Sequence, residues 1–266
     1  MSHSSFKGRL VLCVVGSLLT LGCSSEPAAT TPTSSLGQAA EPTAAQPTPT
    51  PKPETKPAAA TAVQPAVEPP TAAVSGLAAQ LPTELQAHFI ALSRLKGEIE
   101  FGVGDRIISI DLDGTKATDA DIVHIAALPD VKSLNLANTA ITDAGLKELG
   151  KLKKLKFLYL FNTAVTDAGA AHLQALPRLE VLCLDQTQIT DVGLRSLEEL
   201  PRLEKLHVHS NSPITDAGLE SLKKHTRLFE LRVGGSGITE KGLAALKAAL
   251  PDCNVVYDPE AAAKAD

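Results

Sequence analysis

The segment from Val131 to Arg202 reads VKSLNLANTAITDAGLKELGKLKK, LKFLYLFNTAVTDAGAAHLQALPR and LEVLCLDQTQITDVGLRSLEELPR. These are three consecutive copies of one 24-residue unit, with no residue between them. Self-similarity at a fixed period is typical of repeat architectures, in which each unit buries its apolar face against its neighbours. The segment therefore predicts an extended binding surface rather than an enclosed catalytic pocket.

The same unit continues on both sides of this segment. One 24-residue copy precedes it at Ile107–Asp130, and two 25-residue copies follow at Leu203–Arg227 and Leu228–Asp252. The extra residue falls in a loop in the fifth copy and at the helix end in the sixth, where an insertion leaves the periodic core in register. We therefore expect six repeats over residues 107–252.

Each unit opens with two apolar residues separated by one position, which predicts a strand with one buried face. In the first four units a threonine follows, and its hydroxyl can satisfy loop backbone groups that would otherwise be buried unpaired. In most units a Thr-Asp pair then precedes a helix, and either side chain can cap that helix. In the last five units a glycine follows shortly after this position and predicts close approach between the helix and a neighbour. The apolar pairs are Ile110/Leu112, Leu134/Leu136, Leu158/Leu160, Leu182/Leu184, Leu206/Val208 and Leu231/Val233.

The shared pattern LxxLxLxxTxITDxGLxxLxxLxx resembles the leucine-rich repeat family, in its cysteine-containing or F-box-like variant. The resemblance implies an α/β solenoid with parallel strands on the concave side and helices on the convex side. Eukaryotic members of this variant are substrate receptors of ubiquitin ligases. This chain has no F-box, and its N-terminal segment argues against that role.

Residues 76–106 are expected to cap the first repeat, whose core a solenoid would otherwise expose. We predict a helix over Leu81–Gly97, with Thr83 as N-cap, Gln86 completing a capping box and Gly97 ending the helix. Strands at Glu98–Phe101 and Arg106–Leu112 would follow, joined by a turn.

Residues 1–22 have the features of an export signal. Lys7 and Arg9 precede a 12-residue apolar run, which is too short for a spanning helix. The ending LTLGC resembles a bacterial lipobox, with Thr20 in place of the usual aliphatic residue. The resemblance implies a lipid on Cys23 and anchoring in the bacterial cell envelope, with Ser24 favouring the outer membrane. An ordinary cleaved signal with an unmodified Cys23 is the alternative.

Residues 23–75 consist largely of Pro, Thr, Ala and Gln, without periodicity. Such a segment cannot bury enough apolar surface to fold, so we predict a disordered tether that spaces the repeats from the membrane. At the other end, residues 253–266 are expected to form a closing strand, containing Cys253, Val255 and Val256, and a short tail from Asp258 onward.

The strand positions beside the inward leucines should face the concave surface. Phe157, Tyr159 and Phe161 share one strand in a chain with only eight aromatic residues, and exposed aromatics are enriched at binding hot spots. We predict a protein partner here, with neighbouring strands contributing Asp185, Lys205, His207, His209 and Arg232.

Cys183, Asp185, His207 and His209 are metal-ligand types on adjacent predicted strands. No ligand-spacing motif accompanies them, so we predict no metal and no cofactor. A Cys-His nucleophile pair would lack an oxyanion hole on an open strand surface, which predicts neither catalysis nor a small-molecule substrate. Cys183 and Cys253 lie about three strands, roughly 14 Å, apart and should not form a disulfide.

The net charge of −5 does not indicate a basic surface for binding nucleic acid. Two functions remain. The first is a non-catalytic, envelope-anchored scaffold that binds a protein on its concave face. The alternative is a structural envelope lipoprotein that contacts cell-wall polymer, with the repeats as a spacer.

Overall fold

The computed structural model describes residues 76, 78–211, 214–234 and 237–258. The expected export signal (1–22), lipidation site Cys23, tether (23–75) and the tail beyond residue 258 lie outside the described residues. No helix in the described part of the chain is long and apolar enough to cross a membrane.

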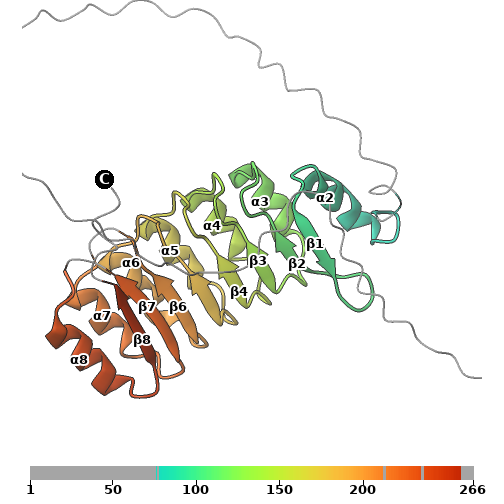
Figure 1. Cartoon of the computed structure of the whole chain (residues 1–266). Helices are drawn as coiled ribbons and strands as arrows, with labels where there is room; N and C mark the ends of the chain where they lie inside the picture. The colour runs from blue at the N-terminus through green and yellow to red at the C-terminus, as the bar shows by residue number, and fades with distance from the viewer. Residues whose placement is uncertain (1–75, 77, 212–213, 235–236, 259–266) are drawn as a thin grey trace, which may run out of the picture. The chain divides into compact units, whose positions relative to one another are not determined.

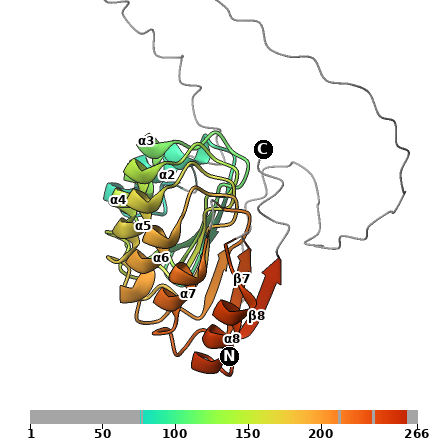
Figure 2. The same ribbon diagram turned by 90° about the vertical axis from the view of Figure 1, so that its left-hand side faces the viewer.

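Strands and helices alternate along the described chain, and the strands pair in chain order (Figure 1). The helices lie on one side of the sheet (Figure 2). The strands are β1 (Glu98–Phe101), β2 (Ile107–Asp111), β3 (Ser133–Asn135), β4 (Phe157–Tyr159), β5 (Val181–Cys183), β6 (Lys205–Val208), β7 (Glu230–Gly234) and β8 (Asn254–Asp258). The helices are α2 (Thr83–Ser93), α3 (Asp119–Ala126), α4 (Asp143–Leu149), α5 (Asp167–Leu173), α6 (Asp191–Ser196), a 3₁₀ turn η1 (Leu197–Glu199), α7 (Asp216–Leu222) and α8 (Glu240–Ala249).

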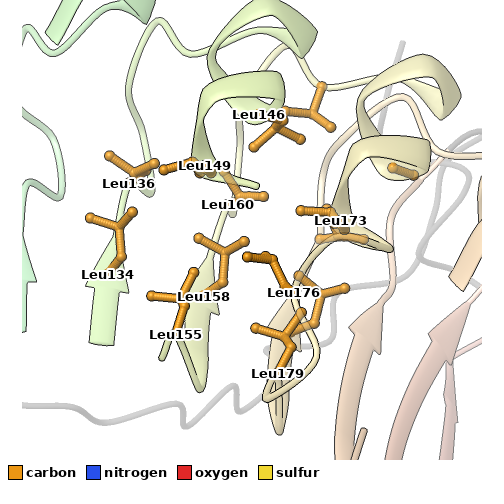
Figure 3. Close-up of a cluster of buried hydrophobic side chains, with 14 of the residues drawn as sticks. Leu134, Leu136, Leu146, Leu149, Leu155, Leu158, Leu160, Leu173, Leu176 and Leu179 are labelled. Atoms are coloured by element: carbon orange, nitrogen blue, oxygen red, sulfur yellow. The ribbon is translucent and has the colours of Figure 1, made fainter. Parts of the chain in front are cut away.

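The repeat sets the register of the sheet. β1 and β2 are antiparallel, and every later pair is parallel, with Leu134 opposite Leu158 and Leu158 opposite Leu182. All three leucines are fully buried. Leu134 and Leu158 point toward the helices, on the side where the helical residues Leu149 and Leu173 lie (Figure 3). The predicted α/β architecture with about six repeats is therefore confirmed.

The threonine after each strand has the role that the sequence predicts. Its hydroxyl donates to the carbonyl of the residue three positions earlier, over 2.5–2.8 Å. This bond closes the turn beside the core and satisfies a carbonyl that water cannot reach. The four residues are Thr115, Thr139, Thr163 and Thr187.

The Thr-Asp pairs join neighbouring repeats as well as starting helices. In α4, Thr142 is the N-cap and Asp143 the first helical residue, as expected for a capping pair. The Asp143 carboxylate reaches the next repeat, where it accepts from the Thr166 amide (2.8 Å) and hydroxyl (2.6 Å). The same double contact recurs in Asp119–Thr142, Asp167–Thr190, Asp191–Thr215 and Asp216–Thr239. We call this series the Asp–Thr ladder.

The recurring glycine makes room for the ladder. A Cβ at Gly193 would lie 2.4 Å from Oδ1 of Asp167, closer than atoms can approach. At Gly145, Gly169, Gly218 and Gly242 the corresponding distance to the ladder aspartate is 2.0–2.6 Å. The predicted close approach is therefore confirmed, and the neighbour is a carboxylate of the preceding repeat.

The cap begins and ends differently from the prediction. Pro82 is the N-cap of α2 without a side-chain cap bond, Thr83 is the first helical residue, and Gln86 donates to the Leu81 carbonyl. The capping box is therefore wrong, because the buried Leu81 and extended Pro82 set the entry of the chain. α2 ends at Ser93, and Lys96 rather than Gly97 has the positive φ of 60°. Gly97 is needed for another reason, since its Cβ would lie 2.3 Å from the Asp111 carbonyl oxygen.

The last strand closes the sheet beyond the sixth repeat. β8 pairs in parallel with β7 and contains Val255, Val256 and Asp258. Cys253 lies one residue before β8, is buried and is not disulfide-bonded, and the same is true of Cys183 within β5. The expected absence of a disulfide between them agrees with this geometry, whereas the placement of Cys253 inside the strand was wrong by one residue.

Candidate protein-binding face

The residues beside the inward leucines form a grid on the side of the sheet away from the helices, which we call the strand face. Its first row contains Ser109, Ser133, Phe157, Val181, Lys205 and Glu230, and its second row contains Asp111, Asn135, Tyr159, Cys183, His207 and Arg232. Phe161, Asp185 and His209 follow the strands β4, β5 and β6. The repeat thus brings the sequence-predicted binding residues onto adjacent strands.

The aromatic group lies in the middle of the sheet. Phe157 and Tyr159 belong to β4 and Phe161 follows two residues after its end. All three side chains are half-buried, so one part of each side chain is covered by the protein and the other part is exposed to solvent. Partial burial raises the pKa of the Tyr159 hydroxyl, which therefore stays neutral and able to donate a hydrogen bond.

A charged network lies on the neighbouring strands. Glu230 on β7 accepts from Lys205 Nζ over 2.6 Å and contacts His207 Nε2 at 3.2 Å, both on β6. The bond to Lys205, with the His207 contact, lowers the pKa of Glu230. Lys205 also lies 5.1 Å above the Phe229 ring, a cation–π distance. Lys205 and His207 are therefore held in place, whereas Arg232, half-buried beside His207, has no ion pair within the described residues.

Four positions expected on the strand face are buried instead of exposed. Cys183 and Asp185 are only 8% and 6% accessible, and Ala137 and Gly234 are also buried. The Asp185 carboxylate accepts from the backbone amide of His209 over 2.7 Å, so it ties the loop after β5 to the next repeat. The expectation that the Asp185 side chain is exposed is therefore wrong. His209 remains half-buried, although its Nδ1 is buried without a hydrogen-bond partner among the described residues.

Three of the four residues with potential metal-ligand side chains lie close to one another. One donor atom each from Cys183, Asp185 and His207 lies within 4.8 Å of the other two, and His209 is outside this group. Cys183 Sγ lies 3.5 Å from Asp185 Oδ2. Burial, and next the Asp185 charge, raise the pKa of the Cys183 thiol to about 12, so the uncomplexed thiol is neutral and a poor nucleophile.

The predicted binding residues leave out three residues that lie on this face or beside it. Glu230 holds the charged network together, Phe229 is 46% exposed beside Lys205, and Val256 on β8 is 43% exposed opposite Arg232. The adjacent apolar residues Val255 and Val256 break the alternation of a half-buried strand, and this pattern could have indicated an outward-facing valine.

Comparisons with known proteins agree with this arrangement. Residues 177–224 match a family model described as leucine-rich repeats in two copies, and residues 127–150 match a model described as a leucine-rich repeat. Both matches fall inside the six units that form the sheet and its helices. The chain folds as a leucine-rich repeat solenoid. Domains with leucine-rich repeats typically mediate protein–protein interactions and are generally non-catalytic scaffolds.

Two solved structures are similar to part of this chain. A pollen receptor kinase 3 structure is 20% identical, with 60% of this chain and 76% of that chain covered and a TM-score of 0.42. An internalin from Listeria monocytogenes str. 4b F2365 is 20% identical, with 59% of this chain and 50% of that chain covered and a TM-score of 0.39. No curated protein matches this leucine-rich repeat chain by sequence.

Proposed function

We propose that this protein is a non-catalytic, envelope-anchored scaffold that binds a protein partner on its strand face. The observation that carries the proposal is the group Phe157, Tyr159 and Phe161, which places three of the eight aromatic residues on β4 and in the turn that follows it. Supported, partly exposed aromatic side chains provide large contact area at low entropic cost and are enriched at binding hot spots.

The polar and charged residues on both sides of the aromatic group favour a partner surface that has both apolar and polar groups. Asn135 lies on the neighbouring strand β3, and the Lys205–Glu230 pair lies two and three strands away on the other side. An apolar centre with a polar surround is the usual anatomy of a protein interface. Arg232, which has no ion pair in the described part of the chain, is available to an acidic group of the partner.

Affinity capture from an envelope extract tests this function. The full chain is compared with a Phe157→Ala/Tyr159→Ala/Phe161→Ala variant and with a matched Val123→Ala/Val192→Ala variant, whose exposed valines lie on the helices α3 and α6. We expect the aromatic variant to lose the captured protein by at least about 10-fold, because hot-spot truncations each cost about 2 kcal/mol or more. The helix-face variant should retain it.

An unchanged capture by the aromatic variant, with its far-ultraviolet circular dichroism also unchanged, would show that the strand face is not the binding surface. Capture of cell-wall polymer by all three chains, without any protein dependent on the aromatic group, would instead favour the structural lipoprotein.

Anchoring is the second part of the proposal and rests on residues 7–23 of the sequence. In a bacterial host fed a palmitate analogue, the parent chain should be labelled and recovered with membranes, whereas a Cys23→Ser variant should be unlabelled. A Cys13→Ser variant, altered within the apolar run, is the matched control and should retain the label. Labelling that persists in the Cys23→Ser variant would contradict the lipobox.

A further inference from the structure

The side chains of Cys183, Asp185 and His207 form a cluster that the proposed protein-binding function does not require. Cys183 and Asp185 are two residues apart on one strand and its extension, and His207 pairs directly with Cys183 across β5 and β6. Cys183 and His207 are held in the paired strands β5 and β6, and Asp185, in the turn after β5, is held by the bond from the His209 amide to its carboxylate. This preorganisation keeps the entropic cost of bringing them together low.

Asp185 carries a charge that the surrounding protein does not neutralise. Its Oδ1 accepts from the His209 amide, and among the described residues its Oδ2 accepts only from the Cys183 thiol, a weak donor. No lysine, arginine or histidine forms an ion pair with Asp185 in the part of the chain that the structure describes. Buried carboxylates are normally paired with a cation or coordinate a metal, because desolvating an isolated charge costs several kcal/mol.

The distances suit a small tetrahedral cation. Around Zn²⁺, with bonds of about 2.3 Å to sulfur and about 2.0 Å to oxygen or nitrogen, neighbouring ligand atoms lie roughly 3.5 Å apart. The Cys183 Sγ to Asp185 Oδ2 distance is already 3.5 Å. All three donor atoms lie within 4.8 Å of one another, so a contraction of roughly 1 Å completes the geometry.

Glu230 supplies the outer support that metal-binding histidines usually have. Its Oε1 lies 3.2 Å from His207 Nε2 and fixes the orientation of the ring. The hydrogen bond between a carboxylate and one ring nitrogen leaves the other nitrogen to the metal, and it increases the basicity of the ring. Lys205 Nζ donates to the second carboxylate oxygen of Glu230 over 2.6 Å. The ammonium group of Lys205 is therefore directed toward Glu230.

We propose that Cys183, Asp185 and His207 bind a divalent transition-metal ion of the zinc type on the strand face. A thiolate, a carboxylate and an imidazole are a donor set that suits zinc better than calcium or magnesium, which prefer oxygen ligands alone. The charges balance, since the dication is neutralised by one thiolate and one carboxylate. A fourth position stays open to water or to a partner's side chain. On binding, the Cys183 S–H bond breaks, its proton goes to solvent and the sulfur lone pair forms the metal bond.

This inference is independent of the proposed partner binding and is tested with metal alone. The probe is Co²⁺, which reports thiolate ligation by a near-ultraviolet charge-transfer band, and Zn²⁺ then competes for the site. The protein is the full chain, reduced and chelator-treated, with Cys13, Cys23 and Cys253 changed to serine so that Cys183 is the sole cysteine. We expect one equivalent of Co²⁺ with the band, displacement by Zn²⁺, and an affinity that rises with pH because a proton is released.

Matched variants in the same background separate ligands from neighbours. Cys183→Ser should abolish the band, and His207→Gln and Asp185→Asn should each weaken Co²⁺ binding by at least about 10-fold. Glu230→Gln should weaken it by about 10–100-fold, as for other outer-shell partners. His209→Gln, which alters a residue outside the cluster, should leave it unchanged.

Absence of a saturable band in the sole-cysteine chain would overturn the proposal. So would a His207→Gln variant that binds Co²⁺ as tightly as its parent. Because His207 is half-buried and outside the core, that variant remains informative even where Asp185→Asn disturbs the fold.

Discussion

The junctions between repeats and the junction between the cap and the first repeat are built from different contacts. Between repeats, one aspartate at a helix start binds the amide and hydroxyl of the next N-cap threonine, and this happens at five junctions. At the cap, Thr118 instead bonds to Asp121 of its own helix. The contacts from α2 to its neighbours are apolar packing and a pair of histidines, His88 and His124, with 2.9 Å between their Nδ1 atoms.

Because of this difference, the two kinds of junction should lose stability in different pH ranges. The bonds from Thr239 lower the pKa of the ladder residue Asp216, so that junction is stable above its unfolded pKa of about 3.8 and weakens as the pH falls through the lower folded value. Burial, and next the neighbouring His88, lower the pKa of His124. The cap junction therefore begins to lose stability below the usual histidine pKa of about 6.5, well above the pH at which Asp216 is protonated.

Breaking one rung of the ladder should have the largest effect. Asp167→Ala removes the acceptor of both the Thr190 amide and the Thr190 hydroxyl, and both groups are half-buried. Leaving such donors unpaired costs about 1–3 kcal/mol each when buried, so we expect the free energy of unfolding to fall by about 1–3 kcal/mol. Urea denaturation of the full chain, followed by circular dichroism at neutral pH, measures it.

The sixth repeat provides the matched control. Glu240 has the position of the ladder aspartate in α8, but it is exposed, and no helix follows α8 among the residues that the structure describes. Glu240→Ala should therefore change the free energy of unfolding by less than about 0.5 kcal/mol, as for most surface substitutions. Equal losses in the two variants would mean that the aspartate acts only within its own helix, and the distinction between the two kinds of junction would disappear.

The sequence predicted the parts of this fold that depend on local periodicity. Alternating leucines such as Leu158 and Leu160 set the buried face of a strand, and the following Thr163 bonds only three residues back. The ladder joins residues 23 or 24 positions apart. It was not predicted, because a carboxylate at a helix start can equally cap its own helix. Only the spacing between packed helices decides which neighbour it reaches.

The cap and the strand face were predicted less well for a related physical reason. Neither the cap nor the set of exposed side chains on the strand face recurs along the sequence, so no second copy restricts the prediction. The His88–His124 contact joins residues 36 positions apart, and Pro82 displaced the expected helix start. On the strand face, alternation correctly placed Tyr159 outward, but it could not show that Asp185 is buried by its bond to the following repeat.

The smallest expected effect is a pH response confined to the cap. Between pH 7.5 and 5.5 the unfolded state takes up a proton at His124 more readily than the folded state, because its folded pKa is lowered. Among the charged groups around His124, His88 and Arg94 oppose a positive charge on its ring, whereas Asp121 favours it. After correction of the rates for intrinsic exchange, hydrogen exchange of peptides from α2 should therefore accelerate relative to peptides from α4 and α5 as the pH is lowered.

His124→Asn should remove the pH dependence of this difference in exchange rate, and the control His172→Asn on α5 should preserve it. A cap whose relative protection stays constant over this range in the parent chain would show that the two kinds of junction do not differ in their response to pH.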